Sequence, residues 1–232
     1  MIVFNGKSLT DFGCCADELD SLKRPEWDVT KQEIPGRNGV LTFSNGRFKN
    51  ITLSYDCMVW KNALRNYEGL LAFLAQDSSY HRLEAEAEKE TFRMARFESA
   101  SNQKPSAYFN RIAFTLNFDC KPQRFLKSGE EPLEAQNGSS FYNPTLYAAK
   151  PLLRVYGWGT VGINGRRLLL NQDETAPYTD IDCDLKDAFY GANNRNSFLE
   201  VTDWPELNPG ENVVELGQNI KKIEITPRWW TI

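Results

Sequence analysis

Apolar residues along most of this 232-residue chain alternate with polar or small ones, which is the period of a β-strand with one buried face. Two stretches show the pattern most clearly. In residues 51–59 it runs through Ile51, Leu53, Tyr55, Cys57 and Val59, and in residues 111–120 through Ile112, Phe114, Leu116, Phe118 and Cys120. We therefore predict a strand at each place.

A different period appears between Asn62 and Gln76. There the apolar residues recur every three or four positions, which predicts one amphipathic helix lying across a sheet: Ala63, Tyr67, Leu70, Leu71 and Leu74. Glutamates then occupy every second position from 84 to 90. Alternation outweighs their helix propensity and predicts a hairpin, with its tip at 87–91 and its return strand at 92–97.

The second half of the chain has a different composition. Lys127 to Asn143 is rich in Gly, Ser, Pro and Glu without apolar periodicity, which indicates a linker. Short apolar runs separated by Gly, Asn and Pro follow, and they predict a β-sandwich. These runs are Leu152–Tyr156, Val161–Ile163, Leu168–Leu170, Ile181/Cys183/Leu185, Phe198–Val201, Val213/Leu216 and Ile223/Ile225. We expect domains at 1–127 and 144–232, joined by a linker at 128–143. The fold class is mainly β with one main helix.

Residues 25–55 hold the densest turn signal. The hexapeptide 34–39, IPGRNG, lies between two strand-like segments. Asn45-Gly46 predicts a tight hairpin between Val40–Phe43 and the run that starts at Arg47. Almost nothing in this region resembles an active site, so we interpret it as a surface for assembly.

Composition and charge narrow the function. The formal net charge is −4 and no Lys/Arg cluster supplies the basic surface that a phosphate backbone needs, which disfavours nucleic-acid binding. No apolar run approaches the ~18 residues of a membrane span, and the N-terminus lacks the basic start of a signal peptide. We expect folding in a cytoplasm. The cysteines are odd in number and mostly far apart in the sequence, so we expect them to be buried and reduced: Cys14, Cys15, Cys57, Cys120 and Cys183.

Three sets of residues have features of ligand sites. Residues 157–162 satisfy GxGxxG, but a hairpin turn at 163–166 stands where the helix of a dinucleotide site would begin. Asp180, Asp182 and Asp184 have the spacing of a calcium loop, but its sixth and twelfth positions are Leu185 and Gly191. We expect these aspartates on a solvent face, with Ile181, Cys183 and Leu185 inward. Four tryptophans could form a sugar-stacking platform, although core or interface anchors are the commoner role: Trp158, Trp204, Trp229 and Trp230.

Catalytic chemistry has little support. The chain has one histidine, His81, so a zinc site built on histidines is excluded, and no GxSxG, Walker or HExxH motif occurs. We expect no enzyme activity, no cofactor and no metal.

Several short motifs in combination resemble one family. In the first half they are Phe4–Ser8, Phe12-Gly13, Pro25-Glu26, Ile34–Gly39 and Cys120–Leu126; in the second half Asn143–Thr145, Ala149–Pro151, Ile163–Gly165, Asn208–Asn212 and Ile223–Trp230. Over nearly the whole chain, the sequence resembles the distal tail proteins of bacteriophages with long, non-contractile tails (siphophages).

The resemblance implies a virion structural protein at the tail tip, assembled in the host cytoplasm and without a membrane partner. Its N-terminal domain would form a hexameric ring and channel, and its C-terminal domain would be a galectin-like sandwich. The major tail protein of the tail tube would lie on one face of this baseplate hub, and the tail-associated lysin, adhesion or receptor-binding proteins on the other. DNA would pass the channel without specific binding. The chain lacks the insertions that carry carbohydrate-binding modules in some members.

Identical head-to-tail contacts in such a ring must satisfy the strand edges of each subunit. We therefore expect the turn-rich region to contribute to the subunit interface, through Pro25, Glu26, Trp27, Ile34, Pro35, Gly36, Arg37, Asn38 and Gly39. The alternative is a carbohydrate-binding receptor module that uses the tryptophans of the sandwich.

Overall fold

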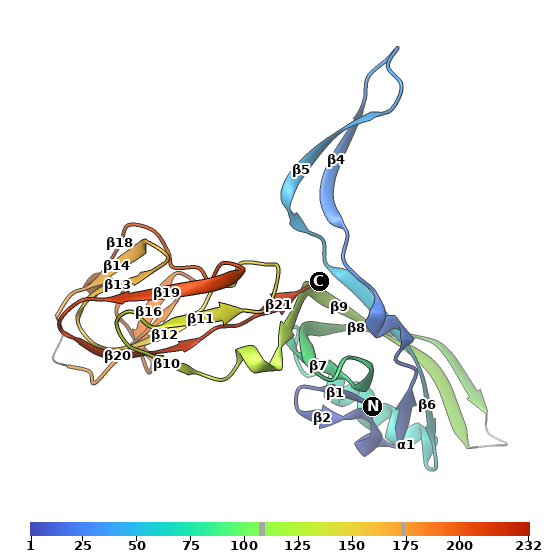
Figure 1. Ribbon diagram of the computed structural model, residues 1–232. Coiled ribbons are helices and arrows are strands. Elements are labelled where there is room, and N and C mark those ends of the chain that lie inside the picture. Colours follow the sequence, from blue (N-terminus) through green and yellow to red (C-terminus); the bar gives the residue numbers. More distant parts are fainter. Residues whose placement is uncertain (107–109, 173–174) are drawn as a thin grey trace. The chain divides into compact units, whose positions relative to one another are not determined.

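The computed structural model describes residues 1–106, 110–172 and 175–232 (Figure 1). The chain divides into two compact units, each with its own hydrophobic core. The first unit comprises residues 1–124 together with Ile232, and the second comprises residues 125–231.

The first unit is built on one sheet with the strand order β2-β1-β7-β8-β9-β6-β3. These strands are β1 (Ile2–Phe4), β2 (Lys7–Ser8), β3 (Cys14–Ala16), β6 (Ile51–Trp60), β7 (His81–Ala85), β8 (Thr91–Ser106) and β9 (Arg111–Leu126). The two strands predicted from alternation pair with each other, from Ile51 opposite Cys120 to Trp60 opposite Arg111. Their inward residues form the core, which confirms the prediction.

Helix α1 (Ala63–Leu74) packs on that core. Ala63, Leu70 and Leu74 are buried as predicted, Tyr67 and Leu71 pack at the margin, and Phe73 adds a buried ring that the predicted stripe omitted. The glutamate-rich segment forms the expected hairpin, in which β7 and β8 are joined through the short 3-10 helix η3 (Glu86–Glu88). Two further 3-10 helices are η1 (Leu9–Phe12) and η2 (Leu19–Leu22).

The second unit is a sandwich of two sheets around one core. One sheet has the order β10-β20-β12-β15-β16-β17 and the other β11-β19-β13-β14-β18. The strands are β10 (Leu133–Ala135), β11 (Ser140–Asn143), β12 (Leu152–Gly157), β13 (Gly159–Ile163), β14 (Arg166–Leu170), β15 (Thr179–Asp182), β16 (Asp187–Tyr190), β17 (Asn193–Asn194), β18 (Leu199–Val201), β19 (Gly210–Leu216) and β20 (Ile220–Thr226). The predicted sandwich is confirmed.

Residues 128–143, which the composition indicated as a linker, belong to the sandwich instead. Ala135 is buried opposite Ile223 in the β10–β20 pair, and Phe141 packs against the core from β11. Each strand buries too few apolar side chains for a periodic signal to be visible in the sequence. The apolar residue 185 also departs from expectation, because β15 ends at Asp182 and Leu185 is 73% exposed.

The GxGxxG stretch at 157–162 lies in strands β12 and β13 and is not followed by a helix, which agrees with the prediction that it is not a dinucleotide site. Asn164 and Gly165, both with positive φ, make the predicted hairpin turn between β13 and β14. Gly157 is needed for a close approach, because a Cβ there would lie 2.2 Å from the carbonyl oxygen of Asn219.

The aspartates of β15 are not on a solvated face. Asp180 and Asp182 are buried and bind arginines: Asp180 accepts two hydrogen bonds from Arg154, and Asp182 accepts two from Arg228, at 2.9 and 2.8 Å. The prediction was wrong because the arginine partners are distant in sequence. Burial alone would raise the pKa of Asp182, but hydrogen bonds from Arg228 and from the amides of Leu185 and Asp184 outweigh it and lower that pKa.

Four of the five cysteines are buried and all five are free, while Cys15 is exposed, contrary to expectation. Cys15 lies on an edge strand and its side chain points away from the core that receives its neighbour Cys14. Burial raises the pKa of Cys120 and of Cys183 to about 12, so both remain thiols at neutral pH.

Replacement of Asp182 by Asn should destabilise the second unit at pH 7 by about 2 kcal/mol, because Arg228 loses its counter-charge. The native pKa of Asp182 is lowered, so its stabilisation is present above the unfolded value and is lost as pH falls through the native pKa. The gap between parent and variant in urea unfolding should therefore close in acid. Asp184→Asn, at an exposed ion pair with Lys150, is the control and should change stability little. A gap independent of pH would contradict the assignment.

Candidate assembly surface

The turn-rich region forms a two-stranded ribbon, β4 (Trp27–Glu33) with β5 (Val40–Phe48), which we call the arm. Figure 1 shows the arm extending away from the sheet of the first unit. Within the described residues these two strands pair only with each other. The arm therefore has two outer edges whose backbone groups have no neighbouring strand in the described chain.

The tip of the arm is the hexapeptide 34–39. It reverses the chain between Glu33 and Val40, which face each other, and the amide of Arg37 donates to the carbonyl of Ile34 at 3.1 Å. Gly36 and Gly39 have φ values of 80° and 84°. Glycine adopts this left-handed conformation without steric cost, which explains the density of turn residues here.

Asn45 and Gly46 do not form the predicted hairpin turn. They lie inside β5, where the pairing shifts, because Val29 faces Ser44 while Trp27 faces Phe48. The extra residues form a bulge, which Arg47 closes with a 2.8 Å ion pair to Asp28. The positive φ of Gly46, 70°, suits a bulge as well as a turn, so the dipeptide signal was correct about conformation and wrong about topology.

The predicted interface residues separate into two groups. Ile34, Pro35, Gly36, Arg37, Asn38 and Gly39 lie together at the exposed tip. Pro25, Glu26 and Trp27 lie at the root, about 20 Å away along the seven-residue strand β4. Pro25 is buried, and the Glu26 carbonyl accepts the Lys49 amide at 2.9 Å. Trp27 is 53% exposed and packs its ring on Phe48.

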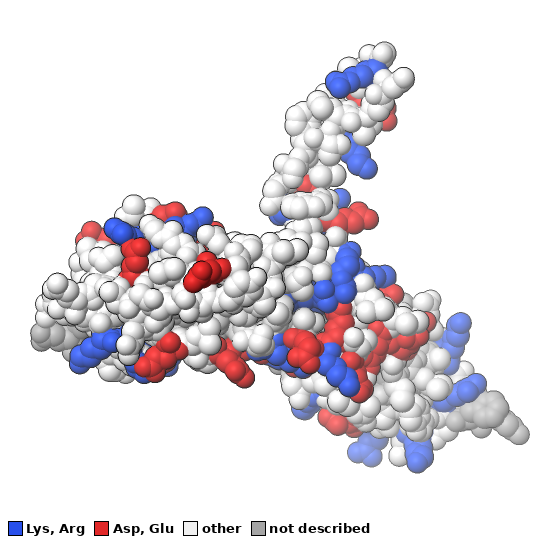
Figure 2. Space-filling model, viewed as in Figure 1, with Lys and Arg blue, Asp and Glu red and all other residues white. Residues whose placement is uncertain are grey.

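The sequence reasoning missed three exposed apolar residues on β5, namely Val40, Leu41 and Phe43. Val40 and Leu41 are consecutive in a strand, so they point to opposite faces of the arm. Both faces thus present apolar surface to solvent, and Figure 2 shows that the visible side of the arm is largely uncharged. The tip carries one basic residue, Arg37. Alternation in the sequence does not reveal that neither face is covered.

An exposed ribbon of this kind is suited to binding another chain. A two-stranded ribbon alone is marginally stable in water, and free edges with apolar side chains favour addition of further strands. A partner that pairs with one edge and covers one face would stabilise the ribbon and satisfy that edge.

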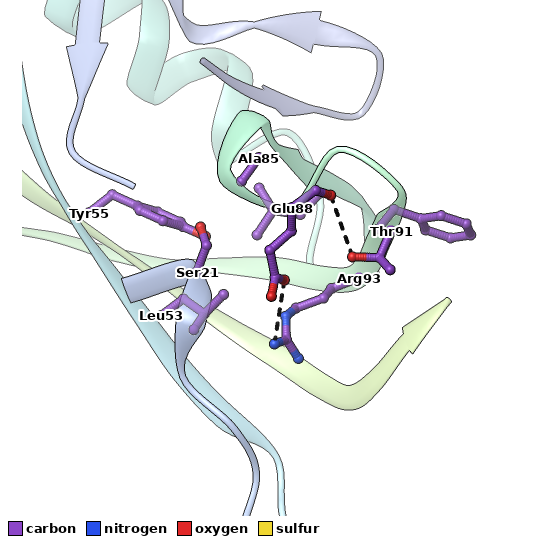
Figure 3. Close-up of a pocket in the computed structure, with 9 residues that line it drawn as sticks. Ser21, Leu53, Tyr55, Ala85, Glu88, Thr91 and Arg93 are labelled. Atoms are coloured by element: carbon purple, nitrogen blue, oxygen red, sulfur yellow. Dashed lines mark hydrogen bonds and ion pairs between the residues drawn. The ribbon is translucent and has the colours of Figure 1, made fainter. Parts of the chain in front are cut away.

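Beside the root of the arm lies a partly buried ionic cluster around Glu88 of η3. The Glu88 carboxylate accepts hydrogen bonds from Arg24 at 2.8 Å and from Arg124 at 2.7 Å, and it lies 3.9 Å from Arg93. Figure 3 shows Glu88 and Arg93 directed toward each other, with Ser21 and Tyr55 nearby. The cavity at this place measures about 10 Å³, enough for one water molecule and no larger ligand.

The described residues offer little for other chemistry. No group of three or more His, Cys, Asp or Glu side chains among them is arranged to hold a metal ion. Within the same residues, no helix combines the length and apolar character needed to cross a bilayer. Of the four tryptophans considered for a sugar platform, Trp229 is buried, while Trp204 and Trp230 pack against the sandwich core. Trp158 is the exposed one, at 38%.

Comparison with solved structures shows that the fold is similar to that of phage hub and baseplate proteins. No protein-family model matches the sequence, and no curated protein matches it significantly. The Dit protein of SPP1, described as a paradigm of the hub adsorption apparatus in phages that infect Gram-positive bacteria, is similar in structure. It matches with a TM-score of 0.69 at 16% identity, over 97% of this chain and 96% of its own.

Two structures of the activated phage P2 baseplate, one with Ca and one with Sr, are also similar. Each matches with a TM-score of 0.51 at 10% identity, over 97% of this chain and 89% of the baseplate chain. The similarity to distal tail proteins that the motifs indicated is thus confirmed at the level of the fold.

Replacement of Glu88 by Gln should destabilise the first unit by about 3 kcal/mol, because three guanidinium groups would lose the carboxylate that neutralises them. Thermal and urea unfolding of the first unit would measure this effect. Glu86→Gln, at an exposed carboxylate in the same 3-10 helix, should have a small effect. Equal stability of the two variants would show that the cluster contributes nothing.

Proposed function

We propose that this protein is a structural hub of a phage tail tip and not an enzyme. The observation that supports the proposal most is the structural match to a phage hub protein, which covers 97% of the chain and so includes both units. Six copies form a ring with a central channel. The tail tube binds one face and the adhesion or baseplate proteins bind the other, and DNA passes through the channel.

The arm supports the assembly role. Head-to-tail contacts in a ring join two different surfaces, so each subunit needs a projecting element and a site that receives it. The arm has free edges, apolar faces and a basic tip, and we propose that it is the projecting element, with residues 25–27 and 34–39 at the subunit interface.

Purified protein should form particles of about 160 kDa, six times the 26.6 kDa chain, with a central hole in negative-stain images. Light scattering coupled to size exclusion measures the mass, and co-expression with the adjacent tail proteins extends the test to rings that need a partner. Monomers under both conditions would refute the ring.

Combined replacement of Ile34 and Arg37 by Asp should shift the assembly to monomers, because buried carboxylates at the tip would repel an apolar or backbone partner. A matched control replaces Leu169 and Arg167, an exposed apolar residue and an exposed arginine on β14 of the second unit, by Asp. In size exclusion, the tip variant should elute as a monomer and the control variant as a ring. Rings from the tip variant would contradict the interface assignment.

The alternative role, binding of cell-wall saccharide by the sandwich, now depends mainly on Trp158. The full-length protein with Trp158→Ala would test it in a polysaccharide pull-down. Binding by the parent that is lost in this variant would favour the alternative.

A further inference from the structure

The two ends of the arm are each fixed by side-chain hydrogen bonds that lie outside the arm itself. The chain enters β4 through Arg24 and Pro25, and it leaves β5 through Lys49 and Asn50 into β6. Arg24 and Asn50, one on each side, hold the arm to different parts of the first unit. We call these contacts the entry anchor and the exit anchor.

The entry anchor joins the segment before β4 to the half-buried carboxylate of Glu88. Arg24 donates to Glu88 at 2.8 Å, and Arg93 donates to the Lys23 carbonyl at 3.0 Å, so the same cluster holds the backbone just before the arm. Pro25 follows, with a fixed φ, and restricts Arg24 to extended conformations. The backbone between Arg24 and the first residue pair of the arm, Trp27 opposite Phe48, is therefore short and conformationally restricted.

The exit anchor joins the segment after β5 to Asp119 on the central strand β9. The Asn50 amide donates to Asp119 at 3.0 Å and to the Tyr80 hydroxyl at 2.9 Å. Tyr80 in turn donates to Asp119 at 2.6 Å, and Arg96 donates to the same carboxylate at 2.9 Å. Asp119 is thus held by three side chains, which makes it a rigid point of attachment.

We propose that the entry and exit anchors set the direction of the arm before assembly, and that Arg24 and Asn50 are positioning residues for the subunit contact. The inference rests on the proposed function of the arm as the projecting element of a ring. A ring closes only when each contact has the same rotation, and a preset arm avoids the entropy loss of ordering it on contact. A ribbon held at its root through only one of its two strands would swing about that attachment.

The test measures the direction of the arm within one chain. Spin labels are placed at Asn38→Cys on the tip and at Glu68→Cys on the exposed side of α1, in a Cys15→Ser background. Labelled protein is diluted into excess unlabelled protein, so that distances between subunits do not contribute. The parent should give one narrow distance distribution by pulsed electron resonance.

Arg24→Gln with Asn50→Ala should broaden that distribution roughly twofold and reduce ring formation, while the melting temperature changes little because both side chains lie near the surface. Arg24→Lys, which keeps the charge, should restore part of the narrow distribution. The controls Lys23→Gln, which removes a neighbouring ion pair with Asp20, and Lys49→Ala should leave both readouts unchanged.

An unchanged distribution in the double variant would overturn the inference, whether or not rings form. Failure of the parent to form rings, both alone and with co-expressed tail proteins, would refute the ring, and the distance distributions would still show whether the anchors direct the arm.

Discussion

Every strand edge carries backbone donors and acceptors that must be paired or solvated, and the two units meet this constraint differently. The sandwich places its edges on short strands such as β17 and β18, of two and three residues. The arm instead presents two long edges together with exposed Trp27 and Phe43. The second unit thus keeps its unpaired edges short, whereas the first unit presents long ones on the arm.

Ion pairs between carboxylates and arginines stabilise both units. Glu88, Asp119, Asp180 and Asp182 each bind one or more arginines. In an enzyme, clusters of this kind mark candidate sites of catalysis. Here the cavity beside Glu88 admits one water molecule, and the ion pairs join segments distant in sequence, which stabilises the fold and the root of the arm.

Most of the fold could be predicted from the local periodicity of apolar residues. The strands at 51–59 and 111–120, helix α1 and the β7–β8 hairpin were predictable because each signal is contained in one continuous stretch. Strand β16 was missed because its only fully buried residue is Ala188. The bonds of Asp182 to Arg228 were also missed, since a partner 46 residues away leaves no local pattern. For the arm, the sequence located the tip, but exposure of both faces depends on the absence of a covering element, which no single stretch encodes.

The bulge at Asn45 and Gly46 has a further consequence for how such an arm can change in evolution. Beyond it, Val29 to Glu33 pair with Val40 to Ser44 in regular register, whereas the pairing of Trp27 with Phe48 is set separately at the root. Residues added in matched pairs near the tip would lengthen the reach of the ribbon and leave the attachment to the sheet unaltered. The reach of the arm is therefore adjustable independently of the core that supports it.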